Sequence, residues 1–256
     1  MVDIHCHILP GLDDGPKALD ESLQMAEAAI ADGITHVVAT PHSSEKYPFD
    51  PALVRSRREE LQAQVGDRLI LATGCDFHMT YENIKALRAD PPRFTINQKN
   101  YLLVEFADFA IPPTLDGVLQ ELLVLGITPI ITHPERNPLL RTGRARLTGW
   151  VKNGCFVQVT ALSLLGRFGQ LAQSAAEKWL DEDAIHFIAS DAHNVTSRPL
   201  QLKQAFELVA KRKSKEVADA LFRENPLAAF EGRPLPYVPA PLDPSAQPKK
   251  KRFIFF

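Results

Sequence analysis

Histidine and carboxylate side chains recur in short groups along this chain. The stretch VDIHCHILPGLDDGP holds His5, His7 and Asp14, and the later stretch SDAH holds Asp191 and His193. In an extended strand, residues i and i+2 point to the same face, so His5 and His7 can reach one ion together. Asp191 and His193 repeat this spacing. Mixed nitrogen and oxygen donors without thiolates suit Zn, Mn or Fe better than Ca or a cysteine-rich structural zinc.

Further residues of the same kinds end apolar runs that are typical of strands. His42 follows ITHVVATP, Asp76 follows RLILATGC, Glu105 lies near the end of YLLVEFA, and His133 closes ITPIITH. A single histidine after a strand is more often structural than a ligand. Carboxylates gathered in one place, however, repel one another and shift their pKa values unless cations neutralise them. About nine donors, at three or four for each ion, predict two or three metal ions.

The other histidines give weaker signals. His36 and His186 lie early or in the middle of predicted strands, and we expect structural or surface roles for them. His78 follows Asp76 by two residues, and its role in the site stays open. Cys6 lies between two candidate ligands and should point to the opposite face of the strand, where it packs as a thiol.

The elements that must position these residues are short strands alternating with helices. Seven apolar runs predict strands at 2–6, 34–40, 68–74, 101–107, 127–133, 155–161 and 184–190. Helical patterns run from near Pro16 to Gly33, from Thr114 as the cap to Gly126, and over about 144–153. This order predicts parallel strands joined by right-handed crossovers. We expect a closed or nearly closed barrel, in which catalytic groups lie at the C-terminal ends of the strands, although a doubly wound open sheet has the same local pattern.

Composition places the chain among ordinary globular proteins. Its 256 residues are 45% hydrophobic and 23% charged, enough for one large α/β domain or two small ones. The net charge of -2 gives no general attraction to nucleic acid or acidic membranes. We expect no membrane span, because no apolar run approaches the roughly 18 residues that one needs. Cys6, Cys75 and Cys155 have no CxxC spacing and read as reduced core thiols, which favours a cytoplasmic location.

A site with several cations favours hydrolysis of a phosphate ester. Bound cations lower the pKa of water, and additional positive charge should stand near the phosphate. Arg136 in THPER and Arg198 in SDAHNVTSR are the candidates to contact phosphate, with Asp191 as a further catalytic residue. A phosphate-binding C-x5-R loop is absent, because the residues six positions after the cysteines are Leu12, Tyr81 and Ala161. GxxxxGK[ST] and GxGxxG loops are absent too.

The last residues have a different composition. From Arg233 the sequence RPLPYVPAPLDPSAQPKKKRFIFF is rich in proline and ends in a basic and aromatic cluster. We expect a flexible tail over 233–256, outside a barrel of residues 1–232. Its last residues could touch a partner or an anionic surface, but a solvated tail without a role in the chemistry is the simpler interpretation.

Together, the motifs DIHCHILPGLDDGP, ATPH, GCDF, LLVEF, GITPIITHPER and HFIASDAHN resemble those of the polymerase and histidinol phosphatase (PHP) superfamily. More narrowly, they resemble the bacterial manganese-dependent protein-tyrosine phosphatases of capsule and exopolysaccharide operons. The similarity runs in order from residue 2 to about 230. It implies a distorted (β/α)7 barrel with a trinuclear metal site, most often occupied by Mn²⁺, with Fe, Zn or Co as alternatives.

The resemblance also implies which residues hold each ion. One ion would take His5, His7, Asp76 and Asp191; a second would take Asp76, Glu105 and His133; and the third would take Asp14, His42 and His193. Arg136 and Arg198 would match the phosphate-contacting arginines. Asp76 departs from the pattern, where a glutamate is expected, so this shorter carboxylate must approach about one methylene closer to bridge two ions.

The implied activity is hydrolysis of phosphotyrosine, with a tyrosine kinase of polysaccharide export as the natural substrate. A small-molecule phosphatase, for example one for histidinol phosphate, stays open, and it would favour a deeper pocket. A metal-stabilised binding module without turnover is a third alternative, although the ligand set is unbroken. Assembly into an oligomer also stays open, since apolar helix faces serve core and interface equally well.

Overall fold

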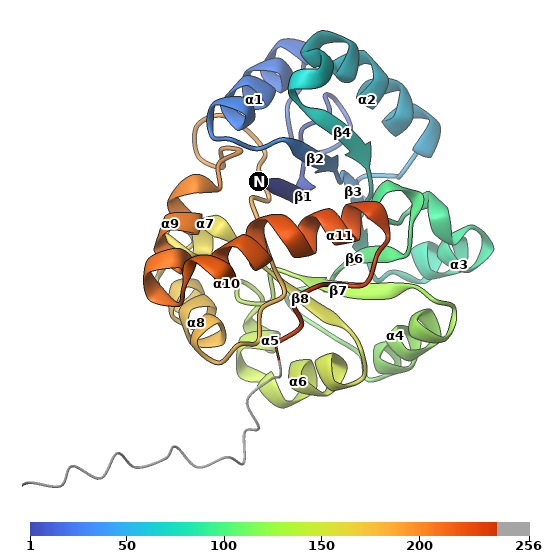
Figure 1. The fold of residues 1–256 in the computed structure, drawn as a ribbon. Helices are drawn as coiled ribbons and strands as arrows, with labels where there is room; N and C mark the ends of the chain where they lie inside the picture. Colours follow the sequence, from blue (N-terminus) through green and yellow to red (C-terminus); the bar gives the residue numbers. More distant parts are fainter. Residues whose placement is uncertain (240–256) are drawn as a thin grey trace, which may run out of the picture.

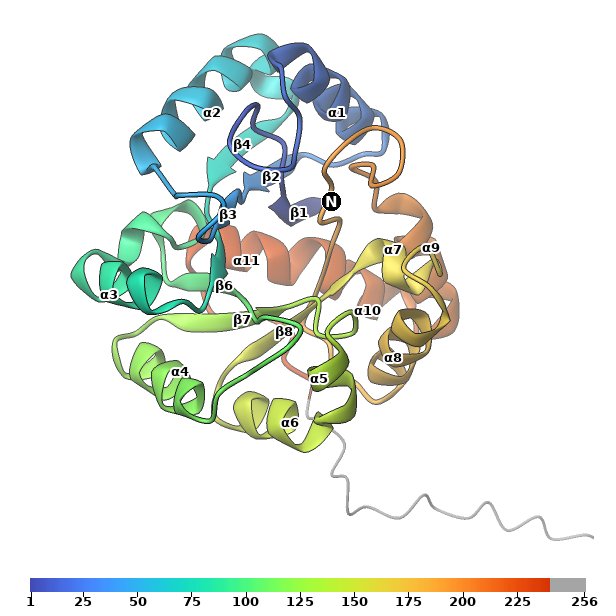
Figure 2. The ribbon, with the colours of Figure 1, turned by 180° about the vertical axis from the view of Figure 1, so that it is seen from behind.

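The computed structural model describes residues 1–239, in which strands alternate with helices (Figures 1 and 2). The strands are β1 (Val2–Cys6), β2 (His36–Ala39), β3 (His42–Ser43), β4 (Ile70–Thr73), β5 (Asp76–His78), β6 (Tyr101–Glu105), β7 (Thr128–Thr132), β8 (Phe156–Thr160) and β9 (Phe187–Ala189). The α-helices are α1 (Leu19–Ala31), α2 (Pro51–Val65), α3 (Tyr81–Ala89), α4 (Thr114–Val124), α5 (Pro138–Thr142), α6 (Arg144–Lys152), α7 (Ala161–Leu164), α8 (Gln170–Asp181), α9 (Lys203–Arg212), α10 (Lys215–Asp219) and α11 (Asn225–Glu231). Three 3-10 turns, η1 (Gly66–Arg68), η2 (Pro91–Arg93) and η3 (Ile96–Gln98), and one π-helical turn, η4 (Ala220–Glu224), complete the set.

Every strand pair is parallel, and the strands form two sheets, β1-β2-β4 and β3-β5-β6-β7-β8-β9. Two predicted strands, 34–40 and 68–74, are each followed by a further short segment that was not predicted: β3 follows β2 after a break at Pro41, and β5 follows β4 after a break at Gly74 and Cys75. Proline cannot donate a ladder hydrogen bond, which explains the first break. The second segments continue the path of the first, because Asp76 N donates to Pro41 O at 3.1 Å.

The end of the last strand returns to the first. Asp191 N donates to His5 O and His7 N donates to Ala192 O, both at 2.8 Å, and Cys6 forms a parallel bridge with Ala192. The two sheets therefore join in a distorted, barrel-like ring with seven strand positions. The expected (β/α)7 arrangement is confirmed, and the alternative of an open doubly wound sheet is wrong.

Helices cover the outside of this ring, and one further helix crosses its end. Figure 1 shows α11 lying across the end at which the chain begins, and Figure 2 shows the opposite end. Ala229 of α11 belongs to a small apolar cluster with Ile4, Leu103 and Phe187 from three strands. The N-terminal end of the barrel is thus closed by apolar packing, which leaves the C-terminal ends of the strands as the end that carries polar groups.

Local features mostly follow the sequence, with one correction. Gly33, predicted to end the first helix, follows α1 with a φ of 84°, a conformation that glycine adopts without strain. The predicted cap at Thr114 is wrong, because Thr114 is the first residue of α4 and Pro113 is its N-cap, without a side-chain hydrogen bond. Pro113 already has helical backbone angles, so the first helical turn begins at the two prolines before Thr114 and not at a threonine cap.

The first residues of the predicted tail contact the barrel. Tyr101 donates from its hydroxyl to Arg233 O at 2.8 Å, and Asn225 exchanges two side-chain hydrogen bonds with the backbone of Tyr237. The division at residue 232 stays a prediction, and the basic and aromatic cluster lies outside the described residues. None of the described helices combines the length and apolar character that a bilayer crossing requires. The three cysteines are buried and unpaired, as the sequence indicated.

Candidate metal centre

All nine predicted metal-ligating residues lie at the C-terminal end of the barrel. His5 belongs to β1, His42 starts β3, Asp76 starts β5 and Glu105 ends β6. The others occupy the loops after β1, β7 and β9, namely His7, Asp14, His133, Asp191 and His193. Because parallel strands present their C-terminal ends at one rim, residues up to 188 positions apart in the chain converge there.

Asp191 lies at one centre of this group. Its Oδ1 is 3.4 Å from His5 Nε2, 3.4 Å from His7 Nε2 and 3.7 Å from His193 Nδ1. His5 and His7 therefore do face the same carboxylate, as the i, i+2 spacing predicted. Cys6 between them is fully buried in the main apolar cluster, which confirms that it is a packed thiol.

Asp76 and Asp14 form two further meeting points. Asp76 Oδ2 lies 3.5 Å from His5 Nε2 and 3.1 Å from His42 Nδ1. Asp14 Oδ1 lies 3.5 Å from His42 Nε2 and 3.3 Å from His193 Nε2. His42 thus stands between the two carboxylates, and each of its ring nitrogens faces one of them.

Glu105 connects the remaining ligand to the cluster. Its carboxylate oxygens lie 3.5 Å from His42 Nδ1 and 3.6 Å from His133 Nε2. His78, left open by the sequence, contacts Glu105 through Nε2 and lies 3.2 Å from His42 Nδ1. His36 and His186 belong to none of the donor groups found in the described residues. The expectation that these two histidines stand apart from the site is therefore confirmed.

Four sets of donor atoms come within 4.8 Å of one another. They are His7 with Asp14, His42 and His193; His42 with Asp76, His78 and Glu105; His5 with His7 and Asp76; and His5 with His133 and Asp191. These sets overlap strongly with the three implied by the sequence resemblance, although they divide the shared residues differently. The donor atoms are close enough together to bind more than one metal ion, with carboxylates shared between neighbouring ions.

The donor atoms that face the centre have no hydrogen-bond partner in the protein, and this observation tests whether metal ions fit the site. His5 Nε2, His7 Nε2, His193 Nε2 and both Asp76 oxygens are buried without a hydrogen bond within the described residues. Buried polar atoms without partners are costly, and several of them aimed at one centre are rare in a folded protein. Imidazole nitrogens and carboxylate oxygens in this arrangement are ligands of first-row transition metals. The residues therefore fit metal ions.

The outer nitrogens of the same histidines are held by hydrogen bonds. His7 Nδ1 pairs with Asp13 Oδ2 at 2.7 Å, and His5 Nδ1 pairs with Gln158 Oε1 at 2.9 Å. Such contacts orient a ligating imidazole and fix its tautomer. Gly15 completes the loop, because a Cβ there would lie 2.4 Å from His7 O. The DDGP turn must therefore pack its backbone directly against the His7 segment.

Two of the residues have strained backbones. His133 has a φ of 31° and Asp191 a φ of 51°, in the left-handed region that residues other than glycine seldom adopt. His133 directly follows β7, and Asp191 lies two residues after the end of β9. Strain of this kind persists where the surroundings enforce it, and it often marks functional sites.

The electrostatics of the centre favour added positive charge. Burial and the negative charge of Asp76 raise the pKa of Glu105. Burial alone would raise the pKa of Asp191 as well, but Arg136 and His5 hold it well below its usual range. Burial and the charge of Arg136 lower the pKa of His133, which keeps its imidazole neutral. Ionised carboxylates and neutral imidazoles are the forms that bind metal.

The two predicted arginines meet at the same carboxylate. Arg136 Nη1 and Arg198 Nη2 both donate to Asp191 Oδ2, the second at 2.5 Å. Each side chain is 23% exposed, so both arginines lie at the edge of the buried centre. Asp191 thus lies between the histidines and the arginines.

Comparison with known proteins places this geometry in a family. Residues 1–231 match the family model for capsular polysaccharide synthesis, CpsB/CapC. CapC of Staphylococcus aureus is 38% identical over 210 residues, covering 80% of this chain and 82% of CapC. The chain belongs to the CpsB/CapC family.

Two further relatives of this CpsB/CapC protein bear on its site. Tyrosine-protein phosphatase YwqE of Bacillus subtilis is 33% identical over 221 residues, covering 85% of this chain and 87% of YwqE. A solved structure from the work on YwqE and on CpsB of Streptococcus pneumoniae, described as metal-dependent tyrosine phosphatases, superimposes with a TM-score of 0.87. It is 31% identical and covers 95% of this chain and all of that one.

The residues that support the ligands in this CpsB/CapC protein are not apparent from the spacing of its histidines and carboxylates. Asp13 and Gln158 hold His7 and His5, and the buried Asp3 accepts hydrogen bonds from Ser190 N and Oγ in the loop before Asp191. The available signal was a polar residue in an otherwise apolar strand, as with Asp3 in β1 and Gln158 in β8. Such a residue needs a buried partner, but the sequence does not say which.

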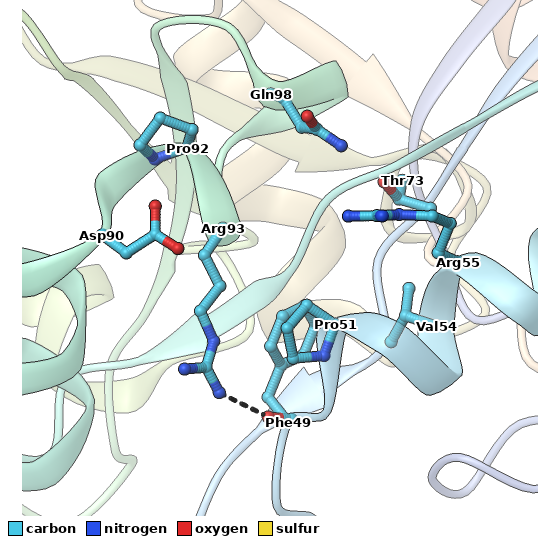
Figure 3. Close-up of a pocket in the computed structure, with 9 residues that line it drawn as sticks. All are labelled: Phe49, Pro51, Val54, Arg55, Thr73, Asp90, Pro92, Arg93 and Gln98. Carbon is cyan, nitrogen blue, oxygen red and sulfur yellow. Dashed lines mark hydrogen bonds between the residues drawn. The ribbon is translucent and has the colours of Figure 1, made fainter.

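Cavities alone would not have located this centre. A pocket of about 150 Å³ lies between α2 and the turns η2 and η3, where Arg93 donates to Phe49 O at 3.0 Å. Figure 3 shows the residues that line it. None of the predicted site residues lines it. A cleft of about 340 Å³ does reach the centre, and Asp14 and His193 form part of its wall. Asp14 is 46% exposed, which makes this side the approach from solvent.

Proposed function

We propose that this chain is a metal-dependent phosphatase that hydrolyses phosphotyrosine in proteins. The observation that carries the proposal is the cluster of buried donor atoms that face one another without protein partners, beside two arginines, in a member of the CpsB/CapC family. Its relatives YwqE and CpsB are described as metal-dependent tyrosine phosphatases, and the barrel and its site agree with that activity.

The ligand sets that we propose are those implied by the sequence resemblance. One ion is held by His5, His7, Asp76 and Asp191, a second by Asp76, Glu105 and His133, and a third by Asp14, His42 and His193. The distances among the Asp14, His42 and His193 donors support the third set most directly. We propose Mn²⁺ as the resident ion, with Fe, Zn or Co as alternatives, and two to three ions for each chain.

Bound cations supply positive charge for the phosphate oxygens and lower the pKa of water near neutral pH. The side chains of the protein then determine how the substrate binds. Arg136 and Arg198 each donate one N–H to the same oxygen of Asp191, and each guanidinium has further N–H donors that can bind phosphate. Guanidinium donors match phosphate oxygens in geometry and charge, and they stabilise charge that spreads over those oxygens during transfer. Asp191 acts as an ionised carboxylate in this scheme, in keeping with its lowered pKa.

The open side of the centre favours a protein substrate. Asp14 and His193 line the cleft of about 340 Å³, so the donor cluster is open to solvent on this side. A phosphotyrosine on a flexible segment can enter such a site, whereas a small metabolite gains more from an enclosing pocket. We propose a bacterial tyrosine kinase of capsule or exopolysaccharide synthesis as the natural partner, acting in the cytoplasm.

Hydrolysis of p-nitrophenyl phosphate by chelator-treated protein, before and after addition of Mn²⁺, tests the proposal. We expect turnover to disappear with the chelator and to return with the metal, and elemental analysis of the active protein to give two to three metal equivalents. A phosphotyrosine peptide should be hydrolysed with a higher kcat/KM than histidinol phosphate. Absence of turnover in metal-replete protein would leave a binding module, and preference for histidinol phosphate would make it a small-molecule phosphatase.

A further inference from the structure

Phe168 lies in the loop between α7 and α8, and both site arginines contact its ring. The guanidinium carbon of Arg136 is 4.6 Å from the centre of the ring, and that of Arg198 is 5.7 Å away. Among the described residues, Phe168 belongs to neither apolar cluster of the core. Its ring is half-buried against cations instead, so apolar packing in the core does not explain this phenylalanine.

The loop that carries Phe168 has a defined backbone. Gly166 and Gly169 flank the segment with φ values of 76° and 83°, which glycine adopts readily and other residues do not. Arg167 N donates to Leu162 O at 2.9 Å, and Gly169 N donates to Gly166 O at 3.2 Å. The sequence GRFG thus forms a compact turn that holds the phenylalanine in one place.

A buried glutamate joins this loop to the loop of Arg136. Glu135 Oε1 accepts hydrogen bonds from Ser163 Oγ at 2.7 Å and from Thr160 N at 3.0 Å. Ser163 belongs to α7, just before the GRFG turn, and Glu135 directly precedes Arg136. The positions of the ring and of the first arginine are therefore set by one connected piece of structure.

Two guanidinium groups that share one carboxylate oxygen repel each other. Asp191 compensates part of this charge, but it is also a proposed metal ligand, and a bound cation draws on the same carboxylate. The face of an aromatic ring carries negative potential and attracts cations, guanidinium above all. A ring in contact with both groups keeps them side by side without adding a negative charge that would repel phosphate.

We propose that Phe168 is a positioning residue for the phosphate group, acting through Arg136 and Arg198. The inference rests on the proposed phosphatase function, because it concerns the binding of an aryl phosphate at that site. A contact between a guanidinium group and an aromatic ring uses none of the N–H donors as conventional hydrogen bonds, so contact with the ring and contact with phosphate are compatible. The ring sets the direction of the donors before the substrate arrives, which lowers the cost of ordering them on binding.

The test compares Phe168→Leu with Phe168→Tyr in metal-replete protein. Leucine keeps apolar volume but has no aromatic face, whereas tyrosine keeps the face. We expect Phe168→Leu to weaken binding of inorganic phosphate about tenfold, which corresponds to about 1.4 kcal/mol, and to raise KM for p-nitrophenyl phosphate similarly. The value of kcat should change less than KM, and Phe168→Tyr should bind phosphate as the wild type does. Calorimetric titration with phosphate measures binding independently of turnover.

Phe206 provides a matched control. It lies in α9, half-buried, with the guanidinium carbon of Arg223 at 4.7 Å from its ring. Phe206→Leu removes the same kind of contact away from the centre, and phosphate affinity should stay unchanged. A second comparison introduces Phe168→Leu into a protein that carries Arg136→Gln and Arg198→Gln. If the ring acts through the arginines, the added change should have no further effect on phosphate binding.

Several results would overturn the inference in a protein that is otherwise active. The first is that Phe168→Leu binds phosphate as tightly as the wild type. The second is that Phe168→Tyr loses as much phosphate affinity as Phe168→Leu. The third is that Phe168→Leu still lowers phosphate affinity in the protein that lacks both arginines. Circular dichroism and metal content should match the wild type in each variant, and if Phe168→Leu does not fold, Phe168→Met serves in the same comparison. Failure of the proposed function appears differently, as a metal-replete wild-type protein that neither binds phosphate nor hydrolyses aryl phosphates.

Discussion

The two sides of the centre are built differently. On the histidine side, defined by His5, His7, His42 and His193, the imidazoles come from strand ends and adjoining turns, and Asp13 and Gln158 fix two of them by hydrogen bonds. On the arginine side, defined by Arg136 and Arg198, the side chains come from loops, and contacts with Asp191 and Phe168 hold them. The first side presents nitrogen lone pairs and the second presents N–H donors.

This difference suggests that metal binding and phosphate binding depend on separate residues. Imidazole nitrogens bind cations once they have lost their protons, and fixed guanidinium groups attract anions, so a change on one side should leave the donor atoms of the other side largely in place. Asp191 is the exception, because one of its oxygens faces the histidines and the other faces the arginines. Variants on either side, and at Asp191 between them, test this separation.

The largest effect is expected from Asp191→Ala. The change removes a proposed ligand and leaves two guanidinium groups beside histidines without compensation. We expect kcat/KM for p-nitrophenyl phosphate to fall by roughly a thousandfold or more, together with loss of metal, since both cation and donor placement are disturbed. Asp181→Ala, which removes a surface pair with Arg212, is the control. Full turnover in Asp191→Ala would refute the proposed site.

Next in size is the effect of pH on metal affinity, which concerns the histidine side alone. Burial would lower the pKa of His7, but the charge of Asp13 raises it to about 9 in the metal-free protein. Below that pH a cation must displace a proton from the imidazole. We expect affinity to rise with pH by about tenfold per unit for each proton displaced and to level off above pH 9. Competition with a chelator of known pH dependence measures this slope.

The stability of the metal-free protein should follow the opposite trend. The contribution of His7 is fully present below its unfolded pKa near 6.5 and is lost as pH rises through about 9, because its folded pKa is raised. Asp13 has a folded pKa lowered to about 2, against the effect of burial and chiefly by the charge of His7, so its contribution is lost only in acid. Chemical denaturation at pH 7 and pH 9.5 measures the free energy of unfolding with and without metal. Between these pH values it should fall in the metal-free protein, whereas the additional stability given by bound metal should rise. The pairing of His7 with Asp13 would be contradicted if the free energy of unfolding changed with pH in the same way in the metal-free and the metal-bound protein.

A smaller effect is expected from Asp13→Asn, which weakens the support of His7 but removes no proposed ligand. Contacts that orient a ligating histidine typically account for about 10- to 100-fold in metal affinity. We expect a loss in that range, with phosphate affinity of the metal-saturated variant close to the wild type. Asp116→Asn is the control, since the Asp116 carboxylate also accepts hydrogen bonds, here from Arg146 and Trp150, but lies in α4. Unchanged metal affinity in Asp13→Asn would show that His7 needs no such support.

The same comparison explains what could be predicted from the sequence. The histidine side could be predicted from the sequence, because donors that follow successive parallel strands must meet at one rim of the barrel. The supports of that side, Asp13 and Gln158, could not, since a hydrogen bond between distant residues depends on side-chain directions that no spacing encodes. Phe168 was missed because its place depends on two loops being joined through Glu135. The predicted strand 34–40 ends directly before Pro41, and the short segments β3 and β5 that follow the second and third predicted strands were not predicted.

The smallest effect tests the arginine side by itself, with Arg198→Lys. Lysine keeps the charge but has a single ammonium in place of a planar fork, so it cannot hold both Asp191 and a phosphate oxygen in fixed directions. We expect KM for p-nitrophenyl phosphate to rise about tenfold, with metal content unchanged. Arg88→Lys, which alters a surface pair with Glu121, should change neither quantity. A drop in metal content with Arg198→Lys would show that the arginines help to form the metal site, and the two sides would then act as one unit.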